Sequence, residues 1–205
     1  VTRQWNNTYE NTLDYVAPGN SPKIISEKTA KGSIIKAPHF STLSNRLLLK
    51  HGATKYKLFR KALTAVVEIL QFILPIGAKK PIYKAADEYL SNHKVDIIIA
   101  SGDPFILFKY AHQLSKKYGI PWIADYRDPW SNDMSLVGNK PMAMFYKRLE
   151  KKYLNSAAQI TTVSEFLKQK IKEIKPNAKV SILPNGFDSD TADQVKNIKQ
   201  DKKTL

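Results

Sequence analysis

The sequence contains no cysteine. This absence excludes disulfides, thiolate metal sites and thiol nucleophiles, and it fits a reducing cytoplasm. Four histidines are scattered without the spacing of metal ligands, so no structural zinc site is expected and nothing in the sequence requires a metal. Neither a Walker sequence nor the pattern Gly-x-Gly-x-x-Gly occurs, so the two best-known phosphate-binding loops are not present in this sequence.

Acidic residues are scarce: 33 Lys and Arg stand against 18 Asp and Glu, a net charge of +15. Between Lys28 and Val67 there is no acidic residue, while nine are basic. An excess of this kind predicts an anionic partner. The candidate contact residues are Arg46, Lys50, Lys55, Lys57, Arg60 and Lys61.

This basic stretch also carries leucines and aromatics, which leaves three interpretations open. It suits an anionic membrane surface, where cationic amphipathic segments bind. It also suits a solvated helix face whose apolar side packs on the core. Nucleic acid is the least favoured partner, because no recognised nucleic-acid motif is present.

The N-terminal part shows only short apolar pairs between turns, and Ile34 and Ile35, followed by Lys36, are expected in an edge strand. Residues 58–76 predict a long apolar helix that ends at Pro75 and Gly77. Charged residues within that helix argue against a transmembrane span.

From residue 81 onward, apolar strands alternate with amphipathic helices. The predicted strands are 95–100, 121–125, 159–163 and 179–183, and the predicted helices are 82–92, 105–118, 142–154 and 164–174. This alternation predicts an α/β fold, a Rossmann-like parallel sheet flanked by helices. Sites in such sheets lie beyond the carboxyl ends of the strands.

Asp125, Arg127 and Asp128 directly follow a predicted buried strand. They form either a polar cluster that lines a cleft, with Arg127 binding a phosphate or carboxylate, or a structural Asp–Arg pair that braces the loop. The loop 101–104 offers a similar choice. It either holds an anion at a helix N-terminus or is an ordinary turn in which Asp103 is the N-cap and Pro104 the first helical residue. Ser164 is interpreted as an N-cap, since no nucleophile-elbow pattern surrounds it.

Three segments of the second half resemble the N-terminal domain of family 4 (group 1) retaining glycosyltransferases, which have the GT-B fold. They are residues 96–105, residues 118–130, and the pair 160–165 and 182–188. Each is short, but their order and spacing together are specific.

The resemblance implies that a sugar is transferred from a nucleotide-sugar donor to a saccharide or lipid-linked acceptor in cell-envelope polysaccharide synthesis, by a hexosyl-type enzyme. The N-terminal domain of such enzymes holds the acceptor, and a C-terminal domain holds the nucleotide. No catalytic residue is assigned, and Arg127 falls near the place where many relatives have a histidine. The residues implied to line the acceptor cleft are Ser101, Gly102, Asp103, Asp125, Arg127, Asp128, Trp130, Ser164 and Glu165.

The resemblance also predicts the organisation of the chain. Residues 1–188 are expected to form one acceptor-side domain without its first strand, and residues 189–205 a linker toward a donor-binding domain outside this sequence. Asn185, Gly186 and Asp188 are placed at the crossing between the two domains. The chain alone is therefore expected to be inactive and to need no cofactor. It is expected in the cytoplasm, peripherally at the inner face of the membrane. The competing hypothesis is a non-catalytic basic α/β module that binds anionic membrane or nucleic acid.

Overall fold

The computed structural model describes residues 15–19, 23–30, 32–38, 40–136 and 138–185. Its first part is a three-stranded sheet of β1 (Tyr15–Gly19), β2 (Ile25–Thr29) and β3 (Gly32–Pro38). β3 lies in the middle, pairing parallel with β1 and antiparallel with β2. The expectation that Ile34 and Ile35 lie in an edge strand is therefore wrong, because β3 has a hydrogen-bonded neighbour on each side.

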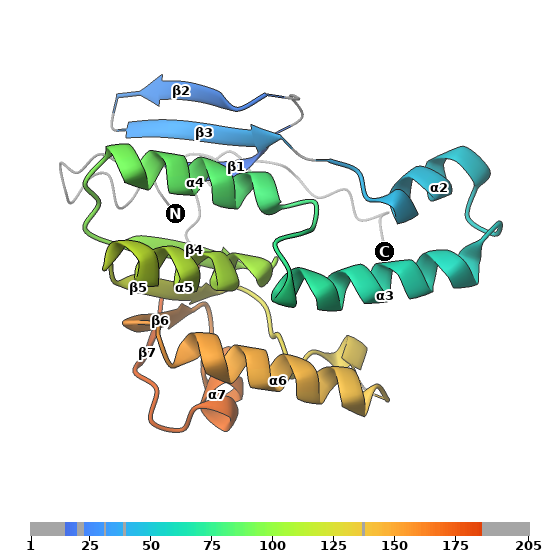
Figure 1. Ribbon diagram of the computed structural model, residues 1–205. Helices are drawn as coiled ribbons and strands as arrows, with labels where there is room; N and C mark the ends of the chain where they lie inside the picture. The colour runs from blue at the N-terminus through green and yellow to red at the C-terminus, as the bar shows by residue number, and fades with distance from the viewer. Residues whose placement is uncertain (1–14, 20–22, 31, 39, 137, 186–205) are drawn as a thin grey trace, which may run out of the picture.

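Two helices follow that sheet. α2 (Leu43–His51) was not predicted, and α3 (Lys57–Ile73) is the long apolar helix expected from the sequence. The α3 backbone turns extended at Leu74, directly before Pro75, as the proline predicts. Figure 1 shows α2 and α3 lying beyond the edge toward which β3 and β4 point.

The remaining elements confirm the predicted alternation of strands and helices. They are α4 (Lys80–Asn92), β4 (Ile98–Gly102), α5 (Ile106–Tyr118), β5 (Trp122–Tyr126), the short 3-10 helix η1 (Met134–Leu136), α6 (Lys140–Leu154), β6 (Gln159–Thr162), α7 (Glu165–Ile174) and β7 (Val180–Ile182). The second sheet has the order β4-β5-β6-β7, and every pairing in it is parallel. The α/β prediction is thus confirmed.

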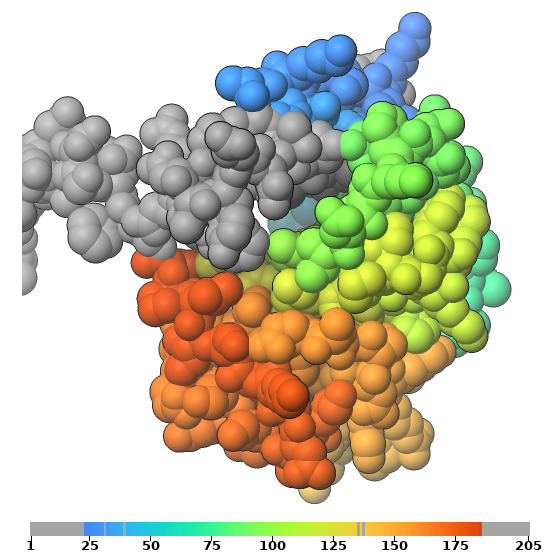
Figure 2. All heavy atoms as spheres, turned by 90° about the vertical axis from the view of Figure 1, so that its left-hand side faces the viewer, coloured from blue at the N-terminus to red at the C-terminus, as the bar shows by residue number. Residues whose placement is uncertain are grey.

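The main core lies between this four-stranded sheet and α5 and α6. Trp122 and Ala124 of β5 are fully buried against Phe108 of α5 and Leu154 of α6. A smaller core of Ile35, Ala37, Ile82 and Ala85 lies between β3 and α4. Figure 2 shows the resulting order of layers: β2 and β3, then α4, α5, and finally α6 with α7.

Candidate functional site

The carboxyl ends of β4, β5 and β6 bring three polar side chains into one row. The parallel register pairs Ser101 with Asp125, and Asp125 with Thr161. Residues paired across a parallel sheet project from the same face, so these side chains meet. Ser101 Oγ donates to Asp125 Oδ2 at 2.7 Å, and Thr161 Oγ1 donates to Asp125 Oδ1 at 2.8 Å.

Arg127 completes this cluster. Its Nε donates to Asp125 Oδ2 at 2.9 Å, and its Nη1 donates to Asn185 Oδ1. Its backbone N–H donates to Gly102 O at 3.2 Å. Arg127 therefore joins β5 to the segment after β7 through its guanidinium, and to the end of β4 through its backbone N–H. We refer to Ser101, Asp125, Arg127, Thr161 and Asn185 as the strand-end cluster.

Burial assigns different roles to the charged members of this cluster. Asp125 is only 6% exposed, and its carboxylate is satisfied by the two hydroxyls and by Arg127. The Arg127 side chain keeps 29% of its surface exposed. A guanidinium has five N–H donors, and within the described part of the chain only Nε and Nη1 donate to other side chains. The cluster can therefore present an oriented cation at the strand ends. The sequence left a cleft cluster and a structural brace as alternatives; the ion pair between Arg127 and Asp125 is such a brace, and the lining of a cleft stays a prediction.

The loop after β4 packs tightly against the aromatic core. A Cβ on Gly102 would come within 2.5 Å of the Phe105 ring, so this position needs glycine. Asp103 lies in this loop and is exposed. α5 begins at Ile106, with Phe105 as N-cap and no side-chain cap. The alternative in which Asp103 caps this helix and Pro104 is its first residue is therefore wrong.

Asp103 also lies close to α3. Burial raises the pKa of the Glu68 carboxyl on α3, and the negative charge of Asp103 raises that pKa further. Lys79 and a hydrogen bond from Gln71 oppose these effects. Sequence reasoning did not place Glu68 near the loop, because a contact between α3 and the β4–α5 turn leaves no local signal.

Other residues named from the sequence lie near the edge without joining the cluster. Asp128 is exposed and has no hydrogen bond or ion pair in the described part of the chain. Ser164 N-caps α7, accepting from the Leu167 N–H at 3.3 Å, as the sequence predicted. Glu165 is exposed in the first turn and pairs with Lys168 at 3.2 Å. Gly186 and Asp188 lie outside the described residues.

Trp130 was predicted to line the acceptor cleft, but it is part of the core. It is 6% exposed and stacks on Phe105 with ring centroids 4.8 Å apart, and it also packs on Phe72 and Tyr153. Its role is to fill the core beneath the strand-end loops. Thr161, in contrast, belongs to the cluster and was missed. The sequence pattern that could have identified Thr161 is the predicted parallel sheet, in which β6 lies beside β5.

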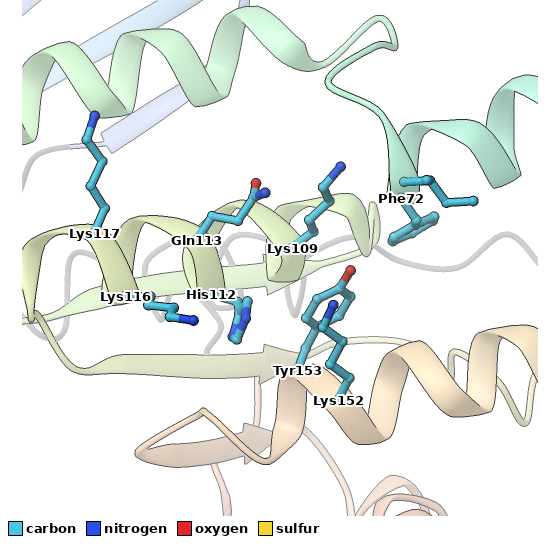
Figure 3. A pocket seen from close by; sticks show the side chains of 9 residues that line it. Phe72, Lys109, His112, Gln113, Lys116, Lys117, Lys152 and Tyr153 are labelled. Atoms are coloured by element: carbon cyan, nitrogen blue, oxygen red, sulfur yellow. The ribbon is translucent and has the colours of Figure 1, made fainter.

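A separate pocket of about 460 Å³ lies along the helical layer rather than at the strand ends. Its lining side chains come from α5, the end of α6 and the end of α3 (Figure 3). Two of its four lysines have structural partners: Lys109 Nζ donates to Gln71 O at 2.6 Å and Leu74 O at 3.2 Å, and Lys117 pairs with Asp87. Burial lowers the pKa of Lys109, as does the nearby charge of Lys152. Lys109 thus stabilises the C-terminal end of α3.

The sequence model of Glycosyltransferase Family 4 matches residues 51–191. This chain belongs to glycosyltransferase family 4. The matched range contains the whole described strand-end cluster and α3. The family membership also confirms the resemblance that the sequence motifs predicted.

The fold of this glycosyltransferase is shared with a solved structure, a sucrose-phosphate synthase from Thermosynechococcus elongatus. The two align with a TM-score of 0.50 and 12% sequence identity, over 94% of this chain and 85% of that chain. The parallel sheet with its flanking helices is the Rossmann-like half of a GT-B fold. No curated protein matches the sequence.

Two kinds of feature are absent from the described residues of this glycosyltransferase. No group of three or more His, Cys, Asp or Glu residues there is arranged to hold a metal ion. Among those same residues, no helix combines the length and apolar character needed to cross a membrane.

Proposed function

We propose that this chain is the acceptor-side domain of a hexosyl-type retaining glycosyltransferase. The complete enzyme transfers a sugar from a nucleotide-sugar to a saccharide or lipid-linked acceptor in cell-envelope polysaccharide synthesis, in the cytoplasm at the inner face of the membrane. Membership of glycosyltransferase family 4 supports the transfer of a sugar. The observation that carries the proposal is the strand-end cluster, at the edge of the sheet where α/β folds bind ligands.

Arg127 is the binding group in this proposal. Asp125 fixes the guanidinium through Nε, and the amide oxygen of Asn185 fixes it through Nη1. Arginine held in this way binds a phosphate or carboxylate with defined geometry. The acceptor, the donor phosphates or both therefore approach the strand ends at Arg127.

Asp128 and Asp103 are the acceptor-orienting groups. Both carboxylates are exposed beside the cluster, and an ionised carboxylate accepts hydrogen bonds from sugar hydroxyls. Asp125 has a different role, because its oxygens are already bonded to Ser101, Thr161 and Arg127. It is a positioning residue rather than a group that contacts substrate.

The donor nucleotide is held by a second domain in this proposal, and no metal takes part. The 205-residue chain alone then transfers no sugar. Incubation of the purified chain with nucleotide-sugars and a panel of acceptors checks this, and product formation would show that the chain carries its own donor site.

Substitution of Arg127 and Asp128 in the complete enzyme tests whether these two residues bind the substrates. Arg127→Ala and Asp128→Ala are each expected to lower kcat/KM by about 100-fold or more, as loss of a group that binds reacting charge does. Arg148→Ala and Asp96→Ala remove the same side-chain types at other exposed positions and are expected to leave kcat/KM unchanged. Circular dichroism checks that all four variants fold. Normal turnover in both edge variants would contradict the assignment.

A further inference from the structure

α3 carries an exposed apolar stripe over its whole length. Leu58, Phe59, Val66 and Ile73 are all exposed, with Leu58 at 82% and Ile73 at 64%. At 3.6 residues per turn these four positions fall within about 100° of the helix circumference. The adjoining helix α2 adds Leu49, which is 81% exposed. We refer to these five residues, with Lys50, Lys55, Lys57 and Lys61, as the α2–α3 surface.

The charges on the α2–α3 surface are mostly positive, and Glu68 is the one acidic residue of α3. Lys50, Lys55, Lys57 and Lys61 are exposed and form no ion pair in the described part of the chain. The first acidic residue after Lys28 is Glu68. Arg60 and Arg46, also candidates from the sequence, are partly used within the protein. Arg60 Nη2 donates to Ala53 O, and Arg46 Nε donates to Ser41 O at 3.2 Å. Lys55 Nζ lies 5.5 Å from the centroid of the Tyr56 ring, and the four lysines therefore supply the positive charge of this surface without a paired carboxylate.

The α2–α3 surface is attached to the edge that carries the strand-end cluster. Phe72, at the C-terminal end of α3, stacks on Trp130 with centroids 5.7 Å apart. Gln71 O accepts from Lys109 of α5. Glu68 lies close enough to Asp103 for the charge of that residue to raise its pKa. The two helices project beyond the carboxyl ends of β3 and β4 (Figure 1). Whatever covers this surface therefore lies beside the strand-end cluster.

We propose that the α2–α3 surface docks on an anionic lipid bilayer, with α3 lying in the plane of the headgroups and its apolar stripe inserted. A cationic helix with one apolar face binds such interfaces. A second copy of this chain fits less well, because it would bring lysines against lysines. Nucleic acid fits less well because it would leave the aliphatic stripe exposed to water. Docking holds the strand-end cluster at the headgroups, and, if the proposed function is correct, the acceptor is a lipid-linked saccharide in that bilayer.

Vesicle flotation of the 205-residue chain tests the docking. Vesicles of phosphatidylcholine alone are compared with vesicles in which about 30% of the lipid is phosphatidylglycerol. The chain is expected to float with the anionic vesicles at least about tenfold more strongly than with the neutral ones, since each of the four lysines contributes near the surface. Binding is expected to weaken as salt is added.

Two double variants, each with a matched double variant as its control, separate the roles of charge and of apolar insertion. Lys57→Glu with Lys61→Glu is expected to reduce flotation at least about tenfold. Lys84→Glu with Lys94→Glu makes the same charge change at exposed positions on and after α4 and is expected to retain it. Leu58→Glu with Ile73→Glu is expected to abolish flotation. Met134→Glu with Phe166→Glu replaces residues of matching exposure, 82% and 63%, and is expected to retain it.

Three outcomes would overturn the docking. The first is that all four double variants float with the anionic vesicles as strongly as the unsubstituted chain does. The second is binding to duplex DNA but to neither type of vesicle. The third is a dimer in sedimentation equilibrium that Leu58→Glu with Ile73→Glu converts to a monomer, without vesicle binding by the unsubstituted chain. Circular dichroism of each variant excludes loss of folding as the cause.

Failure of the docking and failure of the proposed function give different results. If flotation fails while the complete enzyme glycosylates a soluble acceptor, the docking is wrong and the function stands. If flotation succeeds but the complete protein transfers no sugar to any acceptor, the function is wrong and the docking stands.

Discussion

Asp125 shows how a single buried carboxylate organises the candidate site. A buried charge is tolerated when it is paired and hydrogen-bonded, and Asp125 has an ion pair with Arg127 and two hydroxyl donors. Those partners come from β4, β6 and the loop after β5. Loss of the carboxylate would release Arg127 from its fixed orientation, so the charge acts on binding through the arginine.

The sequence predicts the members of the strand-end cluster better than their roles. Ser101 and Asp125 lie near the ends of apolar strands and Arg127 follows one, and a parallel sheet brings such ends together. Whether a side chain at a strand end points to solvent or into the core depends on tertiary packing. Trp130 was therefore misplaced, since the rings of Phe105, Phe72 and Tyr153 that bury it lie far away in sequence.

Glu150 is a second buried carboxylate, and its titration is expected to affect stability. It accepts hydrogen bonds from Tyr126 Oη at 3.0 Å and from the Ser131 N–H at 3.1 Å. Burial raises the pKa of Glu150 above its ordinary value of 4.5, despite these hydrogen bonds. The folded state therefore binds a proton over a pH range in which the unfolded state has released it. Its contribution to stability is fully present below pH 4.5 and is lost as pH rises through the raised pKa.

Glu150→Gln removes this titration. The free energy of unfolding of the unsubstituted chain, minus that of Glu150→Gln, is expected to decrease as pH rises from about 4 to about 8. Urea unfolding at a series of pH values measures it. Glu88→Gln, at an exposed position, controls for the loss of one charge. A difference that does not change with pH would show that Glu150 does not titrate in this way.

At the scale of elements, α3 and everything from α4 onward were predictable, whereas α2 and the pairing of β1, β2 and β3 were not. From α4 onward each strand is a short apolar run and each helix is amphipathic, so local patterns agree with the final fold. α2 was not predicted, because it is held to α3 by tertiary contacts such as Ser44 Oγ to Arg60 O at 3.2 Å, which leave no pattern in the local sequence. β3 was misplaced as an edge strand because pairing partners are not visible in the strand itself.

Substitution of Ser164 tests whether this residue caps α7 or belongs to the site. Its Oγ caps the helix by accepting from the Leu167 N–H. Ser164→Ala is expected to lower the free energy of unfolding by about 1 kcal/mol, and Ser164→Asp to retain it within about 0.5 kcal/mol, since aspartate also caps. Urea unfolding measures both. Ser91→Ala, in the last turn of α4, is the control for an exposed serine. Equal stability of Ser164→Ala and the unsubstituted chain would argue against the cap.

At the scale of the whole molecule, the chain has two apolar cores. The larger core surrounds Phe108, Trp122 and Trp130, and the smaller one joins β3 to α4. Leu107 of α5 packs against both. The sequence predicted one domain over residues 1–188. Within such a domain, a small core joined through few contacts is expected to open at lower free energy than the rest.

Native-state hydrogen exchange tests this unequal stability. Amides of β3 are expected to exchange through an opening of lower free energy than amides of β5, because β5 lies in the middle of the larger core. Ile82→Ala removes a buried side chain from the smaller core and is expected to destabilise it by about 2–4 kcal/mol. Exchange should then accelerate in β3 and remain nearly unchanged in β5.

Ile171→Ala makes the equivalent cavity in the larger core and provides the opposite case. Because the smaller core packs on α4, and α4 in turn contacts α5, loosening of the larger core is expected to accelerate exchange in β3 and β5 together. The expected asymmetry follows from these contacts: the three-stranded sheet packs on α4, and α4 packs on α5 of the larger core. Equal acceleration of β3 and β5 by Ile82→Ala would mean instead that Leu107 and α4 couple the two cores into one cooperative unit.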